Sequence, residues 1–71
     1  MKTINIYNKL KKIDDTFEAK LEYLASRKDL RLVSHMSNDY WDEYTYKGID
    51  GHIDVIKSST GRYEYGWTAD K

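Results

Sequence analysis

The spacing of apolar residues changes near Leu30, and this change constrains the fold more than any other feature of the chain. Before it, apolar residues recur every three or four positions, at Ile6, Leu10, Ile13, Phe17, Leu21 and Leu24. On an α-helix they fall within an arc of about 80°, which is typical of an amphipathic helix. After Leu30, apolar and polar residues alternate, which is typical of β-strands. The chain therefore predicts a helical half followed by a sheet half.

In the helical half we expect one long helix over about residues 3–28, with Thr3 as its N-cap. Basic residues near its end suit the negative pole of a helix dipole. Two alternatives are open. The polar run Asp14–Thr16 could start a second helix, since Asp15 and Glu18 have capping-box spacing, although the apolar stripe keeps its phase through it. Residues 3–7 also alternate, as a short strand would.

In the sheet half we expect four antiparallel strands over about residues 30–37, 40–49, 52–58 and 62–68. Turn-forming residues separate them. Asp50 and Gly51 predict a two-residue hairpin turn with positive φ at both positions, which places Lys47 opposite Asp54. The last hairpin has either an even loop or a three-residue loop. We choose three residues, because Gly61 then stands where a left-handed conformation is needed.

The pattern of alternation divides the sheet into two faces. The helix is expected to cover the face that carries Tyr44, Tyr46, Ile53, Val55, Tyr63, Tyr65 and Trp67. The opposite face is expected to carry His35, Trp41, Glu43, Thr45, Lys47, Ile49, His52, Asp54, Ile56, Arg62 and Glu64. The expected fold is thus α+β, with one long amphipathic helix packed on one face of a four-stranded antiparallel meander.

Size and composition exclude several classes of protein. A chain of 71 residues is long enough for one domain, and it has no cysteine for disulfides or thiolate metal sites. Domains this small bury little surface, so we keep a homodimer open. The N-terminus lacks an apolar signal sequence and no long apolar run could span a membrane, so a cytoplasmic protein is expected. No cofactor is predicted.

The net charge is zero, but it is unevenly distributed. Residues 1–31 hold eight basic and five acidic residues, whereas residues 32–71 hold four basic and seven acidic residues. Sheet aromatics can stack on the bases of a single-stranded nucleic acid, but such sites need a basic groove. The aromatic half of this chain is the acidic half. We therefore keep single-stranded nucleic-acid binding as the alternative function and do not favour it.

Catalytic and metal-binding patterns are weak. His52 and Asp54 stand two apart on one strand face, which is a spacing that two metal ligands or an oriented histidine could use. A solvated strand face explains the same pattern more simply. Adjacent carboxylates such as Asp42 and Glu43 point to opposite faces of a strand, so they cannot act as an acid–base pair. No serine has the context of a nucleophile. We predict no catalytic residue and no metal site.

The strongest functional signal is an apolar group on the expected helix-free face. Trp41, Ile49 and Ile56 stand there among charged residues, which is the composition of a protein–protein contact. We therefore predict a small non-enzymatic protein-binding module, of the kind that phages and prophages use as inhibitors or adaptors of host machinery. The predicted contact residues are Trp41, Glu43, Ile49, Asp54, Ile56 and Arg62.

Overall fold

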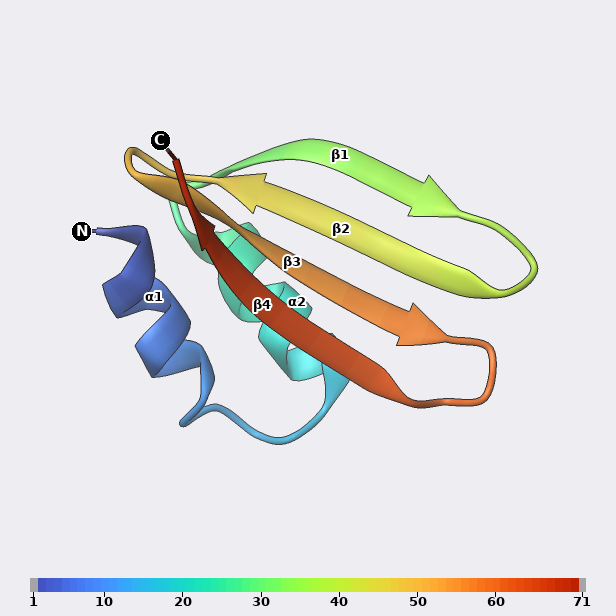
Figure 1. Ribbon diagram of the computed structural model, residues 1–71. Coiled ribbons are helices and arrows are strands. Elements are labelled where there is room, and N and C mark those ends of the chain that lie inside the picture. The colour runs from blue at the N-terminus through green and yellow to red at the C-terminus, as the bar shows by residue number, and fades with distance from the viewer. Residues whose placement is uncertain (1, 71) are drawn as a thin grey trace.

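The computed structural model describes residues 2–70 and has two short helices followed by four strands. The helices are α1 (Thr3–Leu10) and α2 (Phe17–Ser26). The strands are β1 (Arg31–Ser37), β2 (Trp41–Lys47), β3 (Gly51–Ser58) and β4 (Tyr63–Ala69). All neighbouring strands are antiparallel, in the order β1-β2-β3-β4, and both helices lie on one face of the sheet (Figure 1). The α+β class and the meander are confirmed.

The expected single helix over residues 3–28 is wrong, because the chain breaks between Leu10 and Phe17. Thr16 caps the second helix by accepting a hydrogen bond from the Ala19 N–H at 3.1 Å. At the end of the first helix, the Lys20 ammonium donates to the carbonyl oxygens of Leu10 at 2.7 Å and Ile13 at 3.2 Å. The Leu10 carbonyl ends α1 and otherwise accepts only the Ile13 N–H at 3.2 Å, and Ile13 follows the helix, so a cation suits this negative end of the helix dipole. The buried Lys20 thus stabilises the break.

The N-terminus of α1 is capped from the sheet and not by Thr3. Asp50, in the turn between β2 and β3, accepts a hydrogen bond from the Thr3 N–H at 2.8 Å. The Thr3 hydroxyl and the Thr3 N–H both lower the pKa of the Asp50 carboxyl. The hydroxyl itself makes no hydrogen bond of regular geometry, so we assign the cap to the N–H. The contact joins residues 47 positions apart in the chain.

The hairpin between β2 and β3, which contains Asp50, differs from the one expected. Lys47 pairs with His52 and Thr45 pairs with Asp54, so the connection is four residues long and the predicted pairing of Lys47 with Asp54 is wrong. Positive φ is absent from this turn, and among the described residues only Gly61 has it. A Cβ at Gly48 would lie 2.4 Å from the Thr3 Oγ1. Glycine is needed here because α1 approaches closely.

The register shift of two residues leaves the faces of β2 and β3 unchanged, because side chains alternate with a period of two. The buried hydrophobic core confirms the apolar stripe and the helix-covered side of these strands: Ile6, Leu10, Phe17, Leu24, Leu30, Tyr46, Ile53 and Val55. Ile13, Leu21, Tyr44, Tyr63, Tyr65 and Trp67 are partly buried against it. The sheet was therefore oriented correctly from the sequence.

The last hairpin is confirmed. Val55 pairs with Tyr65 and Ile53 pairs with Trp67, as the three-residue loop requires. The Gly61 N–H donates to the Ser58 carbonyl at 3.0 Å, and Gly61 has φ of 92°. Glycine adopts this conformation without the steric cost that a Cβ brings.

An irregularity in β1 overturns the expected position of His35. The pairing with β2 shifts between Leu32 and Ser34, so Val33 is the extra residue of a β-bulge. Beyond it the side chains change faces. His35 therefore stacks on the helix-side Tyr44, with ring centroids 4.0 Å apart, and its Nε2 lies 2.7 Å from Asp42 Oδ1. Met36 moves to the opposite face.

Candidate functional site

The candidate site is an apolar patch on the sheet face opposite the helices, which we call the outer face. We define the Trp41 patch as Trp41, Ile56 and Met36. Met36 and Ile56 both pair with Glu43, from the two sides of β2, and Trp41 lies two residues before Glu43 on the same strand. Trp41 is 37% exposed and Met36 is 52% exposed. The three side chains therefore project from adjacent strands towards the same solvent.

The patch is hollowed between Trp41 and Ile56. A surface hollow of about 240 Å³ is lined by Trp41, Ile56, Ser58, Arg62, Tyr63 and Glu64. The charged residues among them, Arg62 and Glu64, are both exposed to solvent. An apolar hollow with a charged border is the usual form of a pocket that accepts an anchoring side chain from a partner.

The charged residues predicted for this surface lie where expected on the sheet. Glu43 separates Met36 from Ile56, and Asp54 is two residues before Ile56 on β3. The Asp54 Oδ1 accepts a hydrogen bond of 2.6 Å from the Thr45 hydroxyl, so this carboxylate is held in place. Arg62 borders the hollow directly. The structure thus brings together five of the six predicted contact residues: Trp41, Glu43, Asp54, Ile56 and Arg62.

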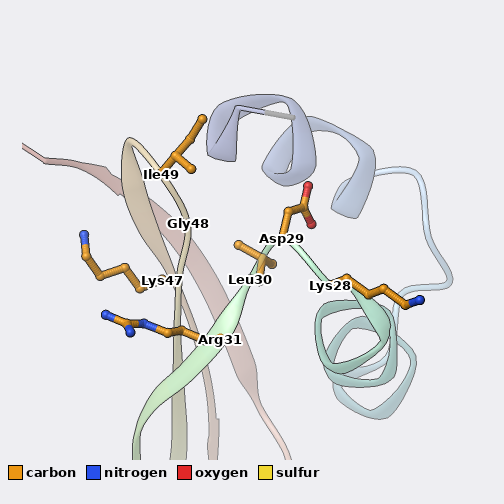
Figure 2. A pocket seen from close by; sticks show the side chains of 7 residues that line it. All are labelled: Lys28, Asp29, Leu30, Arg31, Lys47, Gly48 and Ile49. Atoms are coloured by element: carbon orange, nitrogen blue, oxygen red, sulfur yellow. The ribbon is translucent and has the colours of Figure 1, made fainter.

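Ile49 lies apart from the others. It is 78% exposed at the turn between β2 and β3, whereas Trp41 begins β2 at the other end of that strand. A second hollow, of about 260 Å³, is found at this end of the molecule. Figure 2 shows its lining residues, with Arg31 and Lys47 extending to one side and Lys28 turned away. Because these cations diverge and Lys47 is paired with Asp70, they form no common binding point.

Met36 lies in the Trp41 patch although regular alternation predicts it on the helix-covered face. Regular alternation from Leu30 places it on the same side as Leu32, under the helices, and the bulge at Val33 reverses this. A bulge depends on how two strands pair, so the sequence of β1 alone does not show where it lies. Met36 adds a flexible thioether to the patch, and such side chains adapt to different partners.

His52 and Asp54 are the residues whose spacing could have suited a metal ion. The His52 Nε2 lies 3.6 Å from Asp54 Oδ2, which is an ion-pair distance, and Asp54 is also bonded to Thr45. Within residues 2–70, His, Asp and Glu side chains do not gather into a group of three that could hold a metal ion. We therefore assign the pair to the electrostatics of the outer face.

Two findings complete the description of the chain. Over the described part of the sequence, neither helix is both long enough and apolar enough to cross a bilayer. Comparisons with protein-family models, with curated proteins and with solved structures found no match. The outer face is the part of the described structure whose geometry suggests a function.

Proposed function

We propose that this protein is a small non-enzymatic binding module whose outer face docks on another protein. The single observation that carries the proposal is the apolar hollow between Trp41 and Ile56 on the sheet face that the helices leave uncovered. A tryptophan that is partly exposed beside such a hollow is the type of residue that dominates binding energy in protein contacts. Binding would bury the Trp41 patch and leave the helix-covered core unchanged.

The charges around the patch indicate the chemistry of the partner. Glu43 and Glu64 contribute two carboxylates and Arg62 contributes one guanidinium, so the rim is acidic overall. An apolar side chain flanked by lysine or arginine would complement it. A module of this kind can inhibit or adapt host machinery by covering a surface, as expected for a phage or prophage protein. The absence of cysteine suits the cytoplasm as its compartment.

The test compares three alanine variants. Trp41→Ala and Ile56→Ala should each weaken partner binding by about 30-fold or more, which corresponds to a hot spot of about 2 kcal/mol. Ile49→Ala is the matched control, because Ile49 is an exposed apolar residue at the opposite end of the sheet. Partners captured from lysate by wild type and by Ile49→Ala, but not by Trp41→Ala, are then measured by calorimetry.

The control on folding is the melting temperature. Since Trp41 is partly exposed and lies outside the buried core, Trp41→Ala should leave the melting temperature nearly unchanged. Full binding by Trp41→Ala would contradict the proposal. A large loss of stability would instead place Trp41 among the residues that hold the fold together.

Single-stranded nucleic acid is less well supported as a ligand. Tyr46 is buried, and Tyr44, Tyr63 and Tyr65 pack against the core beneath the helices, so these rings are not an open stacking platform. The Trp41 patch has an acidic rim, which would repel phosphates. Retention on a single-stranded DNA column that falls steeply with salt would reverse this preference.

A further inference from the structure

β1 is an open edge of the sheet. It pairs only with β2 among the described residues, and all seven of its residues are exposed. The main helix contacts are with β3 and β4, and Figure 1 shows β1 beyond the helices. A strand at an edge presents a row of backbone N–H and C=O groups that can pair with another strand.

The composition of this edge does not protect it from pairing. Residues 32–38 contain no Asp, Glu, Lys or Arg, and this is the longest run of that kind in the chain. Three of its apolar side chains are about half exposed, namely Leu32 at 49%, Val33 at 48% and Met36 at 52%. Edge strands that avoid association carry charged residues, proline or bulges. Here the bulge at Val33 disrupts the first half only, and residues 34–38 remain regular.

The hydrogen bonding of the hairpin shows which backbone groups are available. The Asn38 N–H donates to the Trp41 carbonyl at 3.0 Å, so Asn38 faces β2. Successive residues of an antiparallel strand alternate between facing their partner and facing away. Met36 therefore faces β2 as well, whereas Ser37 and His35 direct their backbone groups to the free edge.

We propose that a second copy of this chain pairs with β1 in antiparallel register, about a two-fold axis at Met36. His35 of each copy then lies opposite Ser37 of the other, and each such pair exchanges both of its N–H···O bonds. Met36 lies opposite Met36 across the axis, so the two exposed thioethers cover each other. This register uses the regular residues 34–38 and avoids the bulge on both copies.

The charges at the ends of β1 favour a second copy in this orientation. Arg31 begins the strand and Asp39 follows its end, with no charged residue between them. Antiparallel pairing brings the Arg31 end of one copy towards the Asp39 end of the other, at both ends of the interface. Parallel pairing would bring like charges together. The edge is thus complementary to itself, as a two-fold interface requires.

Because the paired segment is short, the contact is smaller than a standard interface of about 1,600 Å² and the dimer should form only at high protein concentration.

A cysteine cross-link tests this register directly. In a non-hydrogen-bonded antiparallel pair the two Cα atoms lie about 4.5 Å apart, which is within disulfide range. The chain has no cysteine, so Met36→Cys introduces a single thiol. The matched control is Thr68→Cys, an exposed residue on β4, the other edge strand of the sheet. Under mild oxidation Met36→Cys should form a covalent dimer at least tenfold faster than Thr68→Cys. Equal rates, or no dimer from Met36→Cys, would overturn the proposal.

Hydrogen exchange on the wild-type protein supplies a second measurement. The amides of His35 and Ser37 should exchange more slowly as protein concentration rises, because the second copy then accepts their hydrogen bonds. Met36→Asp should remove this dependence, since it places two carboxylates face to face. Exchange that is independent of concentration in wild type would also overturn the dimer. These amides report on the edge and not on the Trp41 patch, so the result is separate from that of Trp41→Ala.

Discussion

β3 and β1 belong to the same sheet but have opposite environments. β3 is an interior strand that both helices contact, and its Ile53 and Val55 are completely buried. β1 is exposed along its whole length, although it also contains leucine, valine and methionine. The difference shows that strand-forming sequence does not decide burial, because burial depends on what packs over the strand. Stability is therefore concentrated around β3, whereas the free surface lies on β1 and the outer face.

The sharpest test of this comparison is to truncate one apolar residue on each strand. Ile53→Ala should lower the free energy of unfolding by about 2–5 kcal/mol, because it leaves a cavity under the helices. Leu32→Ala is the matched change on β1. Since Leu32 is half exposed, its loss should cost under about 1 kcal/mol. Urea denaturation measures both. Similar losses for the two variants would mean that β1 is also covered in solution.

A smaller effect on stability is expected from removing the Lys20 ammonium, which joins α2 to the end of α1. Lys20→Met keeps the length and much of the shape of the side chain but removes the ammonium that satisfies the carbonyls of Leu10 and Ile13. The Ile13 carbonyl then loses this partner and the Leu10 carbonyl keeps only the Ile13 N–H at 3.2 Å, so the substitution should cost about 1–3 kcal/mol in unfolding free energy. The control is Lys12→Met, at an exposed position between the helices, which should be near neutral. Equal effects from both substitutions would remove Lys20 from its capping role.

The smallest effect concerns the junction between the covered helices and the open strand. Hydrogen bonds from the Arg27 guanidinium, which joins Asp29 at 2.7 and 2.9 Å, lower the pKa of the Asp29 carboxyl to about 2. Because the pKa of Asp29 is lower in the folded than in the unfolded state, the ionised carboxylate stabilises the fold. This stabilisation is complete above about pH 4 and is lost as the pH falls towards 2. Asp29→Asn should therefore be slightly less stable at pH 7 and lose less stability across that interval.

Urea denaturation at several pH values between 7 and 2 checks this expectation. The relevant quantity is the difference in unfolding free energy between wild type and Asp29→Asn. It should shrink as the solution becomes more acidic. A constant difference would show that the Arg27–Asp29 pair has no electrostatic role in joining the two regions.

Several features could be predicted from the chain because they depend on local period or on one residue's conformational range. The helical stripe identified Ile6, Leu10, Phe17 and Leu24 as core even though the helix was wrongly drawn as continuous. Alternation placed Ile53 and Val55 inward and Ile56 outward, and a two-residue error in the β2–β3 register did not alter this. Gly61 indicated its own turn because only glycine adopts positive φ readily.

The candidate site was predicted less completely for a related reason. Trp41, Glu43, Asp54, Ile56 and Arg62 were grouped correctly on one face, since alternation alone relates them. Ile49 was grouped with them because its strand was drawn two residues too long. Met36 was left out because the bulge lies between it and the residues from which the alternation was counted.

The sequence by itself determined which side chains of the helices and of β2, β3 and β4 point towards the core, because side-chain periodicity is a property of the chain. Only the tertiary structure decided where the helix breaks, how β2 and β3 are aligned, and which way His35 and Met36 point. Lys20 satisfies α1 from α2, and Asp50 caps α1 from a turn 47 residues later. The register of β2 against β3 and the bulge in β1 depend on how separate strands fit, whereas the break between the helices also had a local signal in Thr16, which caps α2.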